Sequence, residues 1–400
     1  MMNETLHLPR RGLSPMALAF VVVAIGAVGI VVQALHDPTR ALHAFLAAYG
    51  FGVGTALGAL VLAMSLIASG ARWPLVLMPR IFAVSSTLPV FALLFVPLGL
   101  GLRHLYPWAH DTSALDLPVQ AAIAHQRAWN NPTFFLARTL VYLASWCFLA
   151  LLLSRAHEAH ARSPSAKLVA RQRTLSAAGL PIVAFTMTFA SFDWLMSVEP
   201  GWVSNAYGLY FSCGALMSAV SLVAVSTYVG RASLPPSVAP NPAHFHALGR
   251  LMLMTVILWA YIGFFQLMLP WIGNLPREVS FFAARARGSY VVFDGLLLFG
   301  HFVVPFLLLL SRPLKRRGAT LAAVGAWLVL MNAVDLAWLV LPSLDEHIHV
   351  LDIAPFLFVV GLTFAHALRS FEDFEAHALP AGERARRDPA FAESSRYTSP

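Results

Sequence analysis

Ten apolar segments, each long enough to cross a lipid bilayer, dominate this sequence. They lie at about 15–35, 41–69, 80–101, 134–154, 175–196, 206–228, 250–271, 290–310, 321–341 and 353–367. A helix needs roughly 20 apolar residues to cross the ~30 Å hydrocarbon core. Only 12% of the residues are charged, whereas about 25% are charged in ordinary soluble domains. The sequence therefore predicts an all-α polytopic membrane protein with about ten transmembrane helices.

The basic residues are divided unevenly between the two sides of the predicted membrane domain. Of the 27 Lys and Arg, 20 lie on the side of the N-terminus and 6 on the opposite side, and Arg138 lies in the fourth segment. The positive-inside rule then predicts that both termini are cytoplasmic. We expect a cytoplasmic N-terminal tail over 1–14, a membrane domain over 15–367 and a polar cytoplasmic tail over 368–400. Because the positive-inside rule explains where the basic residues lie, the net charge of +8 does not indicate a nucleic-acid partner. We expect membrane lipid to surround the chain.

The N-terminus has an alternative interpretation as an export signal. Arg10 and Arg11 precede the first apolar segment, as the paired arginines of a twin-arginine signal do. The segment is long enough to span the membrane and lacks a cleavage site of small residues. We therefore expect it to be the first transmembrane helix.

Two short matches suggest an internal repeat. The fourth and eighth segments both end in LLLSR, at 151–155 and 308–312. Asp193 in the fifth segment and Asp335 in the ninth each lie seven residues before a proline. Both matches are offset by four helices, and an even offset preserves helix direction, as in parallel repeats. The pattern predicts two four-helix bundles, at about 41–196 and 206–341.

The stretch from 186 to 202, TMTFASFDWLMSVEPGW, places Asp193 at membrane depth. An ionised carboxylate there costs roughly 2.5–3.5 kcal/mol on insertion scales, so such residues usually face the protein interior or a wet cavity. Asp335 lies at a similar depth in the ninth segment. The positive-inside orientation puts both aspartates in the outer half of the membrane, where they are candidate functional residues.

The eighth segment adds Asp294 and His301, seven residues apart and so on one face of an α-helix. Protonatable groups at this depth are what a proton relay requires. Asp193, Asp294, His301 and Asp335 are therefore predicted to form a proton path. The alternative is that Asp294 and Asp335 only satisfy helix ends or pair with cations such as Arg138.

The sequence gives little support for a bound redox centre. Cys147 and Cys213 stand alone in apolar segments and form neither a haem-attachment nor an iron–sulfur motif. The spacing of His347 and His349 lacks a third metal ligand. We therefore expect no directly bound metal or cofactor. The seventh segment is rich in Trp, Tyr and Met, which suits either helix packing or a flat apolar ligand such as a quinone.

Three longer stretches resemble a known family: TFASFDWLMSVEPGWVSNAYGLYFSCGAL, HALGRLMLMTVILWAYIGFFQLMLPWIGNLP and AVDLAWLVLP, all within about residues 170–345. They are similar to the second of the two polysulfide-reductase (NrfD)-type membrane subunits of alternative complex III, a bacterial quinol:electron-acceptor oxidoreductase. The resemblance implies a ten-helix subunit of two four-helix bundles in the bacterial cytoplasmic membrane. Its implied partners are a homologous NrfD-like quinol-binding subunit, an iron–sulfur subunit and haem-c subunits of the same complex.

In that family quinol oxidation is assigned mainly to the sister subunit, and the subunit resembled here is linked to a proton path. The resemblance thus implies a subunit without its own redox centre, with a structural and a proton-translocating or quinone-associated role. The residues that it places in the proton path are Asp193, Asp294, His301 and Asp335. Two alternatives stay open at this point. The chain could bind quinol itself as a catalytic subunit, or it could be a secondary transporter with buried carboxylates.

Overall fold

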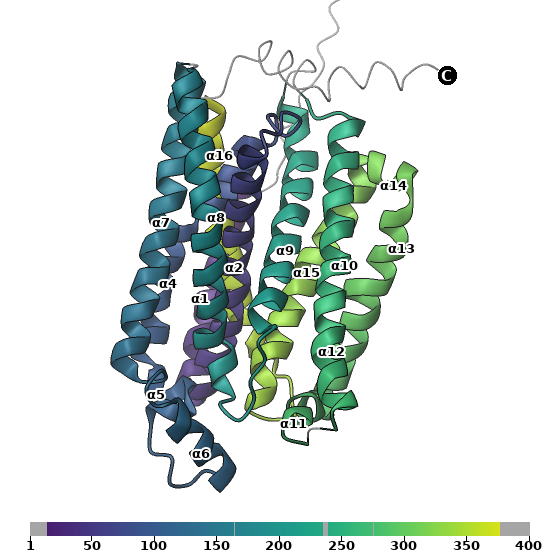
Figure 1. The fold of residues 1–400 in the computed structure, drawn as a ribbon. Coiled ribbons are helices and arrows are strands. Elements are labelled where there is room, and N and C mark those ends of the chain that lie inside the picture. Colours follow the sequence, from purple (N-terminus) through teal and green to yellow (C-terminus); the bar gives the residue numbers. More distant parts are fainter. Residues whose placement is uncertain (1–13, 164, 235–238, 275, 377–400) are drawn as a thin grey trace, which may run out of the picture.

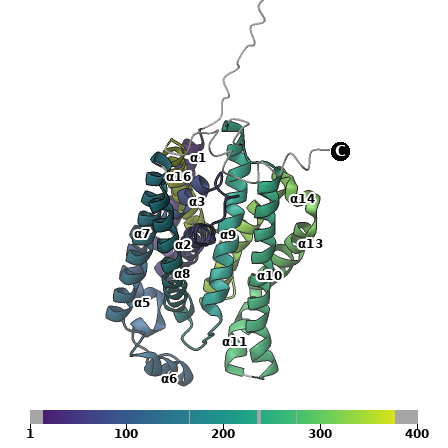
Figure 2. The same ribbon diagram turned by 45° about the horizontal axis from the view of Figure 1, so that its top comes forward.

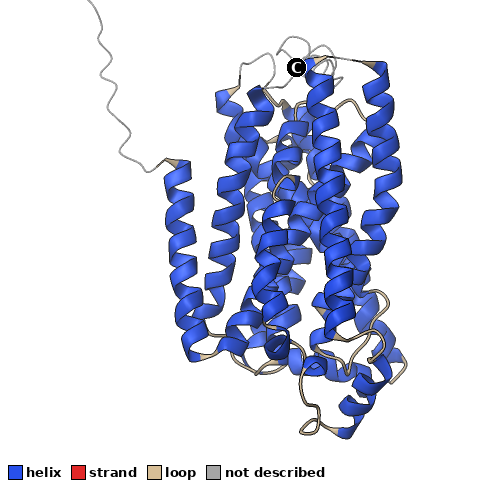
Figure 3. Ribbon diagram, turned by 90° about the vertical axis from the view of Figure 1, so that its left-hand side faces the viewer, coloured by secondary structure: helices blue, strands red, loops and turns tan. Residues whose placement is uncertain are grey.

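The computed structural model describes residues 14–376 except 164, 235–238 and 275, and the predicted tails fall largely outside these residues. Within them the chain folds into helices and loops without a β-strand (Figure 3). Ten helical spans are long and apolar enough to cross a membrane. The predicted all-α polytopic fold is confirmed, with ten spans in the described part of the chain.

The first five spans include one that is interrupted (Figure 1). They are α1 (Pro15–His36), α2 (Pro38–Ala68), α3 (Met78–Ser85) with α4 (Leu88–Leu100), α7 (Pro132–Arg162) and α8 (Ala166–Trp194). The interruption in the third span falls at Ser86 and Thr87, whose hydroxyls bond to the carbonyls of Ala83 and Val84. Side-chain bonds of this kind help to satisfy the backbone carbonyls around a break within a membrane span.

The last five spans include a second irregular one. They are α9 (Tyr207–Val229), α10 (Pro242–Ile272), the composite α12 (Val291–Gly295), η5 (Leu296–Val303) and α13 (Val304–Leu310), then α15 (Gly318–Val340) and α16 (Ala354–Ala376). The segment η5 is a π-helix. Such i→i+5 segments are rare and frequently occur at functional sites.

Short helices connect the spans at both ends of the bundle. They are α5 (Leu102–Leu105), η1 (Pro107–Ala109), α6 (Leu117–Gln126), η2 (Met196–Val198), η3 (Gly230–Ser233), α11 (Pro276–Arg285), η4 (Gly288–Tyr290), α14 (Arg312–Arg316), η6 (Leu341–Ser343) and η7 (Val350–Ile353). We call the end where α1 begins and α2 ends the basic face; α14 lies there, at the top of Figure 1. The opposite face carries α6 and α11, at the bottom of Figure 1.

The helices α2 and α9 lie at the centre of the bundle (Figure 2). The first packs against α3, α4 and α8, the second against α10 and α15, and the two pack against each other. Their contact depends on close approach of the backbones: a Cβ on Gly58 would lie 2.2 Å from the carbonyl oxygen of Ala215. Small residues allow such contacts between membrane helices. At the edge of the bundle, α1 and α16 pack along each other.

Candidate functional site

Asp193, in the last turn of α8, is completely buried. Arg138 of α7 donates to both of its carboxylate oxygens, from Nε to Oδ2 at 2.9 Å and from Nη2 to Oδ1 at 2.8 Å. The indole of Trp129 donates to Oδ1 at 2.8 Å and the hydroxyl of Tyr142 to Oδ2 at 2.9 Å. Three side chains, one of them a bidentate cation, therefore donate four hydrogen bonds to this carboxylate.

The surroundings of Asp193 are aromatic. The guanidinium of Arg138 lies 4.0 Å from the centre of the Trp129 ring. In the loop before α6, the hydroxyl of Tyr106 donates to the carbonyl of Trp194 at 3.0 Å. Burial raises the pKa of Tyr106 well above its ordinary value, and the charge of Asp193 raises it further. Tyr106 thus stays a hydrogen-bond donor that fixes the end of α8.

Asp335, near the end of α15, is also buried, with 1% of its surface exposed. The hydroxyl of Tyr210 on α9 donates to Oδ1 at 2.5 Å, and the indole of Trp259 on α10 donates to Oδ2 at 3.0 Å. Within the described part of the chain, no Lys or Arg forms an ion pair with it. An anion at this site would therefore be buried without a compensating cation, which is costly.

The two aspartates have related surroundings but different charge balance. Each accepts one hydrogen bond from a tryptophan indole and one from a tyrosine hydroxyl. Arg138 adds a cation at Asp193 alone. The alternative that Arg138 pairs with Asp294 or Asp335 is therefore wrong. The hydrogen bonds to Asp335 thus come from neutral donors only.

His301 lies in the π-helical segment η5 and has no exposed surface. Its ring centre lies 4.2 Å from that of Trp259, the donor to Asp335. Neither ring nitrogen has a hydrogen-bond partner among the described residues. A buried imidazole without a protein partner needs a water molecule or another group to satisfy it. The structure thus places an unsatisfied base next to the Asp335 site.

The seven-residue spacing of Asp294 and His301, which predicts one face for an α-helix, runs through the π-helix η5. The π-helix between them winds more slowly than an α-helix, so the seven-residue rule does not hold. Asp294 is half-buried and accepts a bond of 2.7 Å from the indole of Trp338. It lines a cavity, whereas His301 does not. Of the predicted path residues, Asp335 and His301 come together around Trp259, and Asp193 belongs to a separate cluster at α7 and α8.

The cavity next to Asp335 has a volume of about 850 Å³ and lies among α9, α10, α11, the composite eighth span and α15. Tyr210 and Trp259, the two donors to Asp335, form part of its wall. The other lining residues are mostly aromatic or aliphatic, namely Trp202, Tyr207, Ile257, Ala260, Tyr261, Gly263, Phe264, Gln266, Leu267, Phe281, Phe282, Ala286, Asp294, Leu297, Leu298, Phe302, Phe306, Trp338 and Leu339.

The edges of this cavity show where it opens. Tyr261 and Phe264 of α10 are 62% and 63% exposed and lie on the lateral surface of a membrane span. Toward the opposite face, the rings of Trp202 and Phe281 stack with their centres 3.8 Å apart. The cavity therefore opens on the lateral surface of the spans, and aromatic rings cover its end at the opposite face.

A buried arginine that sequence reasoning did not single out borders the same region. Arg285 of α11 has no exposed surface. It donates to Oε1 of Glu199 at 2.7 Å and to the carbonyls of Trp338 and Leu339 at 3.0 and 2.7 Å. Arg285 thus fixes the end of α15, which carries Asp335. In the sequence, Arg285 stands three residues after the phenylalanine pair Phe281 and Phe282.

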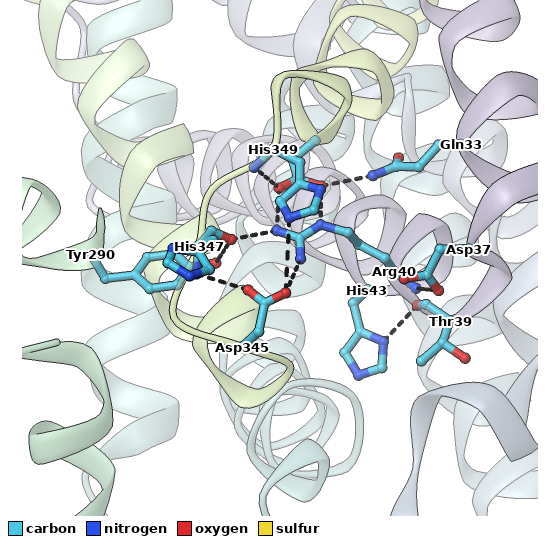
Figure 4. A network of polar contacts seen from close by, with 10 residues as sticks. Gln33, Asp37, Thr39, Arg40, His43, Tyr290, Asp345, His347 and His349 are labelled. Carbon is cyan, nitrogen blue, oxygen red and sulfur yellow. Dashed lines mark hydrogen bonds and ion pairs between the residues drawn. The ribbon is translucent and has the colours of Figure 1, made fainter. Parts of the chain in front are cut away.

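A second cluster that the sequence did not reveal surrounds Arg40 (Figure 4). Its guanidinium bonds to Asp352 at 2.8 and 2.9 Å and to Asp345 at 2.7 Å, and Gln33 donates to Asp352 at 2.7 Å. Arg40 is 4% exposed. His349, in the loop that also contains Asp345, is 53% exposed. The cluster joins the α1–α2 turn to the loop before α16.

The described residues contain no group of three or more His, Cys, Asp or Glu side chains arranged to hold a metal ion. Fold and site together define a polytopic α-helical membrane protein. Between α9, α10 and α15 lies a buried carboxylate, that of Asp335, which has no ion pair with a described Lys or Arg and lies beside a lipid-facing cavity. The sequence matches no protein-family model and has no significant match among curated proteins.

Proposed function

We propose that this chain is an integral membrane subunit of a respiratory quinol:electron-acceptor oxidoreductase of the alternative complex III type, in the bacterial cytoplasmic membrane. Its role is to accommodate a quinone and to transfer protons, while partner subunits carry the redox centres. One observation carries the proposal: the donors to the buried carboxylate of Asp335, Tyr210 and Trp259, are also the wall of an apolar cavity open to lipid.

The size and lining of the cavity suit a quinone. Binding sites for small molecules commonly have volumes of roughly 300–1,000 Å³ and mostly apolar walls with a few polar groups, and this cavity of about 850 Å³ falls in that range. Its aromatic side chains can stack on a flat ring, and Gln266 and Asp294 supply polar groups. A lateral opening allows a ligand with a long apolar tail to enter from the membrane.

Quinol oxidation releases protons, so the region around the ring needs a proton acceptor. Asp335 has neutral donors only and lies directly behind the cavity wall. His301 is a further base next to Trp259. We propose that Asp335 and His301 form the central part of the proton path. Asp193 would serve the same path from the first bundle, with its charge balanced by Arg138.

The orientation follows from the distribution of charge. Of the 27 Lys and Arg, 20 belong to the side on which the chain begins, so the positive-inside rule makes the basic face cytoplasmic. Asp193 and Asp335 then lie in the outer half of the membrane. Protons released in this half of the membrane are close to the outer aqueous phase.

A secondary transporter is a less favourable explanation. Repeats in transporters carry broken helices at corresponding positions of their two halves. Here the interruptions lie in the third span, at Ser86 and Thr87, and in the eighth span, at the π-helix. A four-helix offset pairs the third span with the seventh, which is the continuous helix α10. The irregularities therefore do not correspond.

Purification of the tagged full-length chain from its native membranes in mild detergent tests the proposal. We expect haem-c and iron–sulfur polypeptides to co-elute, a haem spectrum in the eluate, and quinol-dependent reduction of an electron acceptor. An unrelated polytopic membrane protein with the same tag, purified in parallel, controls for general carry-over. A colourless chain that elutes alone, without quinol oxidation, would refute the assignment.

A further inference from the structure

A second hollow, of about 470 Å³, lies on the basic face between the ends of α2 and α7 and the beginnings of α3 and α8. We call it the basic pocket. Its wall contains Arg72, Arg173, His157 and His160. Among the described residues, no Asp or Glu lines it. The basic pocket therefore presents positive charge without an acidic side chain to neutralise it.

Two arginines reach the basic pocket from different segments. Arg72 lies in the turn between α2 and α3, and Arg173 lies on α8. The turn begins with Gly70 at φ +66°, a left-handed conformation that favours glycine. The side chain of Arg173 lies over this turn, with Nη2 2.6 Å from the position that a Cβ on Gly70 would occupy. The backbone turn thus makes room for the second guanidinium.

Neither arginine is bound to another described part of the chain by a hydrogen bond or ion pair. Both are exposed. Below them the wall is apolar, with Leu75, Met78 and Val169 among the lining residues. Guanidinium groups bind phosphate oxygens in a bidentate manner. A ligand that fits this arrangement has an anionic phosphate at one end and apolar chains at the other.

We propose that the basic pocket binds the head group of an anionic phospholipid, with its phosphate between Arg72 and Arg173 and its acyl chains along the apolar wall. Basic pockets between transmembrane helices on the cytoplasmic side bind anionic head groups in this way. The proposal does not depend on the respiratory function or on a particular partner. It concerns the first bundle, away from the cavity beside Asp335.

The test compares two double variants of the full-length protein. Arg72→Gln/Arg173→Gln removes both cations of the basic pocket. Arg155→Gln/Arg171→Gln removes the same charge from exposed arginines of α7 and α8 that do not line the pocket. Lipid binding to delipidated protein is measured by native mass spectrometry with phosphatidylglycerol and with phosphatidylcholine. We expect the pocket variant to bind phosphatidylglycerol about tenfold more weakly or worse, and the control variant to bind like the wild type.

A third variant keeps both arginines of the basic pocket but fills its volume. Ala161→Trp, on the wall of the basic pocket, is expected to reduce phosphatidylglycerol binding as strongly as the loss of the arginines. Size-exclusion chromatography confirms that each variant is folded and monodisperse. Equal loss of lipid in both arginine variants, or wild-type binding by the filled pocket, would overturn the proposal.

Inorganic phosphate distinguishes the lipid from a soluble anion. We expect phosphatidylglycerol to raise the thermal stability of the delipidated wild type and inorganic phosphate at the same concentration to have no effect. If phosphate alone stabilises the wild type equally and this effect disappears in Arg72→Gln/Arg173→Gln, the ligand is a soluble phosphate and the lipid assignment is wrong. If neither ligand stabilises the wild type, the proposal is likewise refuted.

Discussion

Arg138 and Asp193 form a bidentate ion pair between α7 and α8, with donor–acceptor distances of 2.9 and 2.8 Å. Neither partner has more than 8% of its side chain exposed. The pair is therefore a fixed structural connection between α7 and α8, and removal of one partner leaves the other as a buried, uncompensated charge.

The first prediction concerns this pair. Arg138→Gln should destabilise the protein by about 3–5 kcal/mol, because breaking a buried pair on one side is more costly than replacing both partners. The neutral double variant Arg138→Gln/Asp193→Asn should recover part of that loss. Thermal unfolding in detergent measures both, with Arg127→Gln on the exposed surface as the control. A single variant as stable as the wild type would show that Asp193 does not need the cation.

The second prediction concerns the contact between α2 and α9. Gly58→Ala places a methyl group 2.2 Å from the carbonyl oxygen of Ala215, so α2 and α9 must move apart. Overpacking of this kind costs about 1–3 kcal/mol. Gly99→Ala is the matched control, because its nearest neighbour would be 3.5 Å away. We expect a lower melting temperature for Gly58→Ala alone, and similar values for the two variants would contradict the close approach of these helices.

The third prediction tests Asp335 as a proton-transferring group. Asp335→Asn retains the shape of the side chain but removes its ability to exchange a proton. In liposomes that contain the purified complex, quinol-driven proton release should fall by about one order of magnitude or more, while the complex still assembles. Asp116→Asn, in an exposed loop, should leave proton release unchanged. Normal proton release by an assembled Asp335→Asn complex would remove Asp335 from the path.

The fourth prediction concerns the cavity beside Asp335. Ala260→Trp fills it from the wall formed by α10, whereas Leu258→Trp adds the same indole on the lipid-facing side of that helix, outside the cavity. We expect quinone analogues to raise the thermal stability of the wild type and of Leu258→Trp. For Ala260→Trp, the analogue concentration that gives the same rise in thermal stability should be about tenfold higher, or no rise should occur. The reason is that the added indole leaves no room for a quinone ring in the cavity. Equal responses of the two variants would place the quinone elsewhere.

The sequence allowed the ten spans to be predicted because a helix that must satisfy its backbone in lipid leaves a long apolar run. The ends were less accurate. The fourth segment was predicted to end near residue 154, but α7 continues to Arg162, since a helix can extend past the bilayer with polar side chains. The π-helix around His301 leaves no distinct pattern of apolar residues, so the spacing of Asp294 and His301 was interpreted as α-helical.

Individual aspartates at membrane depth could be found from the sequence, but their partners could not. Trp129 precedes Asp193 by 64 residues, and Tyr210 precedes Asp335 by 125. Such pairs form only when distant helices pack, and a single sequence contains no record of that packing. The difference between a charge-balanced Asp193 and a cation-free Asp335 is therefore a property of the tertiary structure.

The pairing of the first span with the last has a consequence for biogenesis. Gln33 at the end of α1 bonds to Asp352, 319 residues later in the chain. At translation rates of 5–20 residues per second, the first helix must wait roughly 15–60 s in the membrane before its partner is synthesised. Throughout that interval Arg40 lacks the carboxylate of Asp352. A nascent chain that stops before Asp345 lacks both carboxylates that pair with Arg40 in the finished protein, and one that stops between Asp345 and Asp352 lacks the second of them.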